Sequence, residues 1–153
     1  MVAQAVPIRL CEERDLDRFG AFGSERHVAH CRQEFGRGPG LAILVAVDEN
    51  DAAVGKLHLD FECRAADRSA MLIAAGVRPE LRRRGIGTAL MRAAEELVSS
   101  RGFRAIVLGV EDSSPAARRL YEGLGYEPFA TDNFKYLGAP APNPGVSMRK
   151  ELE

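Results

Sequence analysis

Cysteine is scarce in this sequence, and its spacing argues against a disulfide framework. The 153 residues include Cys11, Cys31 and Cys63, an odd number with no CxxC pair among them. Small secreted domains that depend on disulfides carry denser and usually even-numbered sets. We therefore expect reduced thiols and a cytoplasmic location.

An excess of one charge and long apolar runs are also lacking. The formal net charge is −1, so the chain as a whole does not attract nucleic acid, and any anion site must be local. No apolar stretch approaches the roughly 20 residues that cross a bilayer. The first residues turn charged at Arg9, so we expect neither a signal peptide nor a membrane partner.

The remaining composition is that of an ordinary globular chain. Hydrophobic residues make up 46% of the sequence and charged residues 28%. This length suits one compact domain with its own core. We expect residues 1–153 to form a single domain.

The order of apolar patterns predicts an α/β fold. Strands are expected where apolar residues cluster or alternate, and helices where they recur every three or four positions. The predicted strands are residues 6–10, 41–47, 54–63, 69–77, 104–110, 126–129 and 145–152. The predicted helices lie within 12–35, with a break near Gly20 and Gly23, and over 86–101 and 115–124. This order indicates a mixed central β-sheet flanked by helices.

Two of the predicted strands carry specific expectations about burial. In residues 54–63, Leu57, Leu59 and Phe61 fall on one face, and Lys56, His58, Asp60 and Glu62 fall on the other. Polar faces of this kind usually meet solvent, so His58 and Asp60 are only secondary candidates for a catalytic base. The nearly all-apolar run 69–77 is expected to be covered on both faces.

The densest positive run stands directly before a predicted helix. Arg82, Arg83 and Arg84 precede Gly85-Ile86-Gly87. The GxxxxGK[ST] pattern of a P-loop is absent, and a GxGxxG dinucleotide fingerprint would need glycine where Leu90 stands. A helix start offers unbonded N–H groups, glycine permits close backbone approach, and arginine binds phosphate. This pattern therefore predicts a site for a polyanion such as pyrophosphate. The alternative interpretation is an arginine cluster that only contacts solvent.

The motif around this turn resembles a known family. Val77-x-Pro79-Glu80-x-Arg82-x-x-Gly85-x-Gly87-x-Ala89-Leu90 resembles the acyl-CoA-binding motif of the GNAT (Gcn5-related N-acetyltransferase) superfamily. Residues 105–129, AIVLGVEDSSPAARRLYEGLGYEPF, are similar to the strand, helix and LYEKLGF-type ending that follow in that family. The resemblance runs from about Leu72 to Phe129. It implies the acyl-CoA N-acyltransferase (GNAT) fold, acetyl-CoA as cosubstrate, and no metal.

The resemblance also implies where the cofactor is held. The diphosphate would be bound by Arg82, Arg83, Arg84, Gly85, Ile86, Gly87 and Thr88. The pantetheine arm would follow the strand that ends at Val77 and pass Ser114 and Ala117 of the next helix. Ser114 stands where the family often has asparagine, and we expect it to cap that helix. Gly76 is expected to mark a bulge or a close backbone approach; small residues that only pack against a helix are the alternative.

The reaction implied is attack of an amine on the thioester of acetyl-CoA in a ternary complex. The resemblance makes Tyr121 the acid that protonates the departing thiolate, and inward packing is its alternative role. A backbone N–H near Val77 would stabilise the oxyanion. The family's glutamate is missing from residues 71–75, and Gly109 occupies a second position that the family uses. Glu111, on the same strand face as Gly109, is the candidate base; placement at a helix N-terminus or a solvent-relayed deprotonation are the alternatives.

A zinc site is a competing interpretation of one helical face. His27, His30 and Cys31 are spaced to share that face, but no fourth ligand is evident. We expect packed side chains there and no metal.

Three classes of function remain compatible with the sequence. The first is an N-acetyltransferase acting on a small-molecule or peptide amine, with small molecules the first class to test. The second is an acyl-CoA-binding sensor without catalysis. The third is a nucleic-acid-binding module using Arg82–Arg84, Arg92, Arg101 and Arg104, which the net charge disfavours. The family commonly forms homodimers, and nothing in the sequence decides this.

Overall fold

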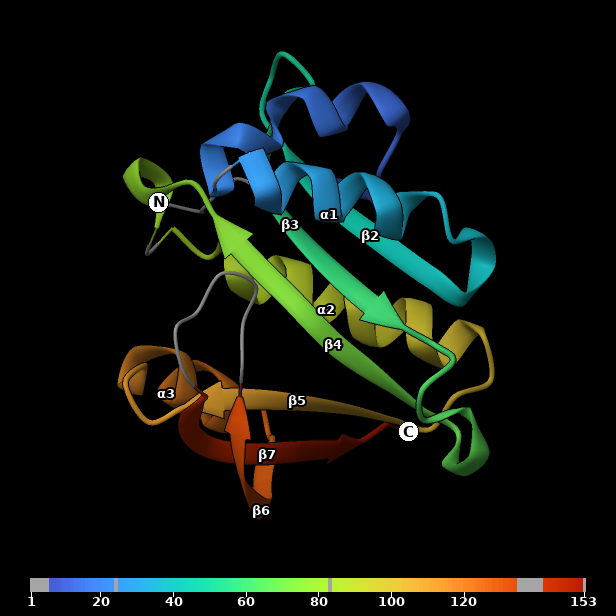
Figure 1. The fold of residues 1–153 in the computed structure, drawn as a ribbon, viewed down its shortest axis with the longest axis vertical. Coiled ribbons are helices and arrows are strands. Elements are labelled where there is room, and N and C mark those ends of the chain that lie inside the picture. Colours follow the sequence, from blue (N-terminus) through green and yellow to red (C-terminus); the bar gives the residue numbers. More distant parts are fainter. Residues whose placement is uncertain (1–5, 24, 83, 135–141, 153) are drawn as a thin grey trace.

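Seven strands form one mixed sheet in the order β1-β2-β3-β4-β5-β7-β6 (Figure 1). The computed structural model describes residues 6–23, 25–82, 84–134 and 142–152. The strands are β1 (Ile8–Leu10), β2 (Leu41–Val47), β3 (Ala53–Asp60), β4 (Ser69–Val77), β5 (Ala105–Glu111), β6 (Glu127–Phe134) and β7 (Asn143–Glu151). Among these strands β4 and β5 pair in parallel, and the other neighbours pair antiparallel. The mixed α/β sheet predicted from the sequence is confirmed.

The helical segments occur where the apolar pattern predicted them. They are η1 (Glu13–Phe22), α1 (Glu25–Phe35), α2 (Ile86–Ser100) and α3 (Pro115–Gly123), with short 3-10 turns η2 (Gly38–Gly40), η3 (Ala65–Asp67) and η4 (Pro79–Leu81). The predicted break falls at Gly23, but η1 is a 3-10 helix, and Gly20 lies inside it. Buried Asp15 fixes the start of η1, because it accepts hydrogen bonds from the Glu12 N–H and from Arg9.

The two faces of the sheet carry separate cores. Leu44, Leu57 and Leu59 face α2, whose buried side chains are Ile86, Leu90, Met91, Ala94 and Val98. Ile43 and Val45 face η1 and α1, which contribute Leu16, Phe19 and Cys31. Ala93 and Leu97 of the same helix are half-buried and pack against this core. All of β2 is buried because helices cover both sides of it.

The polar face of β3 is buried, contrary to the expectation from its alternation. Lys56 is 2% exposed, His58 0% and Asp60 8%. These side chains lie on the face that η1 and α1 cover, next to Ile43 and Val45 in β2. The helices η1 and α1 cover this face and remove it from water. The residue pattern of a single strand does not show that such helices pack on it.

The parallel strands β4 and β5 separate along their length. Their pairing extends from Ser69↔Ala105 to Met71↔Val107 and then stops. In Figure 1 the two strands start close together, and their arrowheads lie far apart. Residues Ile73 to Val77 of β4 are consequently only half-buried or exposed, so the prediction of full cover for this strand was wrong. Within the described ranges, the structure contains no helix long and apolar enough to cross a membrane.

Candidate active site

The opening between β4 and β5 brings together four of the predicted residues, Glu111, Ser114, Ala117 and Tyr121. It holds a hollow of about 280 Å³. The hollow is lined by Phe22, His27, Lys56, Leu72, Ile73, Ala74, Ala75, Gly76, Gly109, Val110, Glu111, Ser114, Ala117 and Tyr121. The walls come from β4 on one side and from β5 and α3 on the other, with η1, α1 and β3 contributing Phe22, His27 and Lys56. Parallel strands that diverge at their carboxyl ends leave room of this kind for a ligand.

The start of α2 presents free backbone donors beside this opening. Gly85 is the N-cap in the left-handed conformation, with φ at 81°, and makes no side-chain cap hydrogen bond. The Ala89 N–H bonds to the Gly85 carbonyl, which places Ile86, Gly87 and Thr88 in the first turn before that bond. Donors in this turn have no partner within the helix and attract anions together with the helix dipole.

The arginines of the predicted anion site are in different situations. Arg82 is exposed, and its Nε donates to the carbonyl oxygen of Val77 over 3.3 Å, which ties the loop to the end of β4. Arg84 is exposed as well. Arg83 lies outside the described residues.

The irregular backbone of β4 lies at Ile73 and not at Gly76. In the ladder with β3, His58 pairs with Ala74 and Leu59 pairs with Leu72, so Ile73 is skipped. Because the pairing with β5 has already stopped at Met71, Ile73 has no register partner on either side. A Cβ on Gly76 would have only Phe22 near it, at 3.7 Å. The expected bulge therefore does not lie at Gly76, which is in register with Lys56, and a close approach of the cofactor at Gly76 stays a prediction.

Tyr121 lines the hollow from α3, as its predicted role requires. The side chain is half-buried, and its ring packs edge-on against Tyr126 with centroids 6.0 Å apart. Tyr126 is fixed in turn, since its hydroxyl donates to Glu95 Oε2 over 3.0 Å. A phenol held by such packing at the rim of a hollow can meet a ligand there, so packing and proton donation are compatible roles.

Glu111 also lines the hollow, but both of its oxygens already accept hydrogen bonds. Ser113 Oγ donates to one oxygen over 3.2 Å, and Asn143 Nδ2 donates to the other over 2.7 Å. These contacts join the end of β5 to the following turn and to the start of β7. Such contacts are typical of a structural clasp, although they leave the carboxylate within the site.

The neighbouring position on β5 has no room for a side chain. A Cβ on Gly109 would lie 2.5 Å from Phe134 Cε1, so the Phe134 ring occupies that space. The carboxylate that related sequences carry at this position could not be placed here without moving Phe134.

Ser114 and Ala117 both line the hollow from α3, but the expected cap is not made. Ser114 is the N-cap of α3, and its side chain makes no cap hydrogen bond. Pro115 follows at the first helical position and has no N–H to satisfy. Ser114 instead holds the turn through its backbone, donating to the Glu111 carbonyl over 3.0 Å.

Sequence reasoning missed a buried polar chain beside the hollow. Lys56 Nζ lies 3.1 Å from His58 Nε2. His58 Nδ1 lies 3.1 Å from Glu34 Oε1 of α1. One signal was available: residues 41–47 are apolar on both faces, so the partner strand's polar face had to be covered too.

Burial and neighbouring charges shift the pKa values of Lys56, His58 and Glu34. Burial lowers the pKa of the Lys56 amine, although the Cys31 and Glu34 side chains act in the opposite direction. Burial likewise lowers the pKa of His58, despite its contact with Glu34. Burial alone would raise the pKa of Glu34, but its contact with His58 and the charges of His58, His30 and Lys56 together outweigh it and lower the value.

The face proposed for zinc does not assemble as the spacing suggested. His30 is half exposed and faces Glu34 at 3.5 Å, while His27 Nε2 lies 3.6 Å from Cys31 Sγ. The side chains that gather among the described residues are Cys31, Glu34 and His58. The Lys56 amine already contacts His58 Nε2 at that place. The absence of metal stays a prediction.

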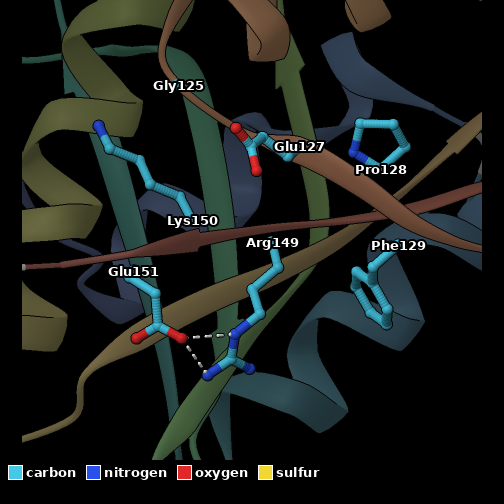
Figure 2. A pocket seen from close by; sticks show the side chains of 7 residues that line it. All are labelled: Gly125, Glu127, Pro128, Phe129, Arg149, Lys150 and Glu151. Atoms are coloured by element: carbon cyan, nitrogen blue, oxygen red, sulfur yellow. Dashed lines mark hydrogen bonds and ion pairs between the residues drawn. The ribbon is translucent and has the colours of Figure 1, made fainter.

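A second hollow, of about 400 Å³, lies around β6 and β7 and is lined by Gly125, Glu127, Pro128, Phe129, Arg149, Lys150 and Glu151 (Figure 2). Arg149 pairs with Glu151 at 2.8 Å, and Figure 2 shows both on the opposite side of β7 from Lys150. Lys150 pairs with Glu95 at 3.0 Å. Arg149, Lys150 and Glu151 thus already have partners of opposite charge within the protein. None of the predicted site residues lines the described walls of this second hollow.

The basic strip proposed for nucleic acid is partly used for internal contacts. Arg101 donates to the Pro39 carbonyl over 2.8 Å, and its guanidinium lies over the Phe61 ring. Arg104 donates to the Asp67 carbonyl over 3.0 Å. These arginines hold loops in place, and nucleic-acid binding stays an untested alternative.

Comparison with known proteins agrees with this geometry. Residues 8–126 match the Acetyltransferase (GNAT) family. The chain is 41% identical over 72 residues to acetyl transferase GW6a of Oryza sativa subsp. japonica, covering 46% of this chain and 17% of that protein. It spans less than a third of the length of the curated relatives it matches.

Solved structures share the fold at low sequence identity. A phosphinothricin acetyltransferase from Sinorhizobium meliloti, in complex with AcCoA, has a TM-score of 0.79 and 21% identity, covering 97% of this chain and 89% of that one. The ribosomal-protein-S18-alanine N-acetyltransferase from Escherichia coli has a TM-score of 0.76 and 20% identity, covering 95% of this chain and 93% of that one. The matched residues include β4, the α2 turn and α3, so the chain belongs to the acetyltransferase (GNAT) family.

Proposed function

We propose that this chain is an acetyl-CoA-dependent N-acetyltransferase whose active site is the opening between β4 and β5. The observation that carries the proposal is that Tyr121 of α3 lines this opening, while the start of α2, which has no side-chain cap, packs against the same helix through Gly87 and Leu120. We further propose that residues 1–153 form a single domain of this kind and that the protein works in the cytoplasm.

The cofactor would enter with its diphosphate on the first turn of α2. The amides of Ile86, Gly87 and Thr88 are the donors offered there, and Gly85 takes the positive φ that the turn requires. Arg82 and Arg84 are exposed beside them and would add charge-assisted hydrogen bonds. Arg83 belongs to the same proposed set from its place in the motif.

The pantetheine arm would lie along the part of β4 that β5 leaves unpaired, from Val77 towards Leu72. Ser114 and Ala117 face this space from α3. An extended, amide-bearing arm can pair with an open strand edge as a further strand would. The acetyl group would then lie near the irregular backbone at Ile73. We propose that this bulge, in place of the backbone near Val77, supplies the oxyanion donor.

The chemistry would be direct transfer in a ternary complex. The amine attacks the thioester carbon, and the Tyr121 hydroxyl protonates the departing sulfur. The acceptor would enter where Phe22 and His27 line the hollow. A primary amine on a small molecule or a peptide would meet these requirements.

Release of free thiol from acetyl-CoA tests this function. The purified chain is mixed with acetyl-CoA and, in turn, phosphinothricin, spermidine and a peptide with an N-terminal alanine. We expect acetyl-CoA to raise the melting temperature, because a ligand that binds the folded state stabilises it. We expect thiol release with at least one amine. Binding without release for every amine would indicate the sensor alternative, and no binding would contradict the function.

A further inference from the structure

Both oxygens of Glu111, the candidate base from the sequence, already accept hydrogen bonds, and the buried polar chain beside the hollow offers another proton acceptor. We propose that Lys56 accepts the proton of the attacking amine, and that His58 and Glu34 position its side chain for this. The inference rests on the proposed function and identifies a catalytic residue on β3, outside the motifs that carry the family resemblance.

The position of Lys56 is the first argument. Lys56 lines the hollow together with Tyr121, although only 2% of its surface is exposed to solvent. The amine lies near the Phe19 and Phe22 rings, 5.7 Å and 6.0 Å from their centroids. An amine with this little access to water is available to a ligand in the hollow and to few other groups.

The contacts of Lys56 are the second argument. With its proton on Nδ1, His58 faces Glu34 Oε1 at 3.1 Å, a charge contact that is not aligned as a hydrogen bond, and it can accept from Lys56 through Nε2 over 3.1 Å. The arrangement serves Lys56 in both protonation states, because a neutral amine and an ammonium can each donate one N–H to His58. Lys56 can therefore gain and lose a proton without moving.

The surrounding charges allow the uncharged amine to form. From α1, the groups that face this region are His27, Cys31 and Glu34, and Cys11 lies close enough to act on Lys56 electrostatically. The β4 wall, from Leu72 to Gly76, is apolar or backbone, and Tyr121 and Glu111 lie on the opposite wall. Burial therefore dominates and lowers the pKa of Lys56, as a base that must be neutral requires.

The proton and electron balance of the step is complete. The amine nitrogen bonds to the thioester carbon, the carbon–sulfur bond breaks, and its electron pair goes to sulfur. Lys56 takes the proton that the nitrogen loses, and Tyr121 gives one to the thiolate. A proton moving from Lys56 to Tyr121 through solvent restores both groups, leaving an amide and free CoA.

Two other roles for this cluster fit less well. A metal held by Cys31, Glu34 and His58 would have to tolerate the Lys56 amine at His58 Nε2. A fixed ammonium that binds an acidic acceptor would not need a lysine whose charged form is disfavoured by burial. The experiments below separate both roles from proton transfer.

Kinetics of variants test the proposal with whichever of the three amines releases most thiol. Lys56→Met should lower kcat by about 100-fold or more, while the acetyl-CoA melting shift remains. Lys56→Arg keeps the positive charge but cannot accept a proton, so it should lose as much. The matched control is Lys150→Met, which removes the half-buried partner of Glu95 near the hollow of Figure 2 and should keep the wild-type kcat. A Lys56→Arg variant with kcat near wild type would show a fixed cation and overturn the proposal.

The pH profile tests the positioning residues. The acid limb of kcat/KM should fall at the same pH for two amines of different basicity, because it reports Lys56. The negative charge of Glu34 favours the charged lysine, so Glu34→Gln should move this limb to lower pH. An acid limb that shifts with the pKa of the substrate amine, or that does not move in Glu34→Gln, would contradict the proposed roles of Lys56 and Glu34. Loss of wild-type activity after EDTA treatment would indicate the metal role instead.

A measurement without any acceptor separates this inference from the proposed function. The sequence contains three lysines, Lys56, Lys135 and Lys150, so ¹³Cε-labelled lysine gives few NMR signals, assigned with the Lys56→Met and Lys150→Met variants. We expect the Lys56 signal to titrate below the ordinary lysine pKa of about 10.4, consistent with burial. A Lys56 midpoint at or above that ordinary value would overturn the inference even if acetyl transfer occurs. A stable acetyl group found on Lys56 by peptide mass spectrometry would overturn it too, because an amide nitrogen cannot act as the base.

Discussion

Gly87 in the first turn of α2 lies directly against Leu120 of α3, since a Cβ on Gly87 would be 3.6 Å from Leu120 Cδ2. Leu120 is the residue before Tyr121, so the proposed diphosphate site and the proposed acid are held together by a helix–helix contact. An ordinary van der Waals distance at this point leaves room for a methyl group but not for a long side chain.

Gly87→Glu should therefore abolish the melting shift produced by acetyl-CoA. The glutamate would bring bulk and a competing negative charge to the place proposed for phosphate, which would repel the diphosphate. Gly87→Ala is the matched control and should retain most of the shift, because its Cβ meets Leu120 at 3.6 Å. Normal acetyl-CoA binding by Gly87→Glu, measured by calorimetry, would show that the diphosphate lies elsewhere.

Tyr121→Phe should lower kcat by about 100-fold, the usual range for a lost acid or base. The ring and its edge-on contact with Tyr126 remain in this variant, so stability and the Kd for acetyl-CoA should change little. Steady-state kinetics and calorimetry on the same preparation check both expectations. An unchanged kcat would leave Tyr121 with a packing role alone.

Glu111→Gln distinguishes a clasp from a base. Glutamine has one uncharged oxygen, so it can accept a hydrogen bond from Ser113 or from Asn143 but not through two charged oxygens as glutamate does. We therefore expect a small loss of stability and less than about a tenfold loss of kcat. The acid limb of the pH profile should stay where it is in wild type. Disappearance of that limb in Glu111→Gln would return the role of base to Glu111.

Asp15→Asn should reduce stability at neutral pH by about 1–3 kcal/mol, because it removes a buried carboxylate that accepts from Arg9 and from the Glu12 N–H. Burial alone would raise the pKa of Asp15, but the hydrogen bonds from Arg9 and the Glu12 N–H, together with the charges of Arg9 and Arg14, outweigh it and lower the value. The stabilisation is therefore present above the unfolded-state pKa of about 4 and is lost as the pH falls through the folded-state value. Urea unfolding at pH 7 and at about pH 3 should show the largest difference between variant and wild type at pH 7. An equal difference at both pH values would mean that the charge of Asp15 contributes nothing.

Gly109→Ala should destabilise the protein by about 1–3 kcal/mol, the cost of overfilling a packed position, because its Cβ would lie 2.5 Å from Phe134 Cε1. Phe134→Ala should remove most of this penalty in the double variant, which a thermodynamic cycle of thermal unfolding can measure. Equal penalties in both backgrounds would mean that Phe134 is not the cause.

The sequence by itself determined the local elements and the motif-bearing half of the site. Apolar periodicity placed α2 and α3, and the glycine and arginine pattern placed the turn at Gly85, because these depend on neighbours along the chain. The resemblance of these motifs to a known family indicated the family and, with it, Tyr121 as the candidate acid.

Only the tertiary structure decided what lies opposite that motif. The alternation of β3 was read correctly, but the environment of its polar face depended on η1 and α1, which pack there from distant positions in the sequence. The bulge at Ile73 and the early end of the β4–β5 pairing depend on register between strands, which no single strand specifies. Burial, and with it the chemistry of Lys56, is a property of the covering layers, so it could not be assigned before those layers were in place.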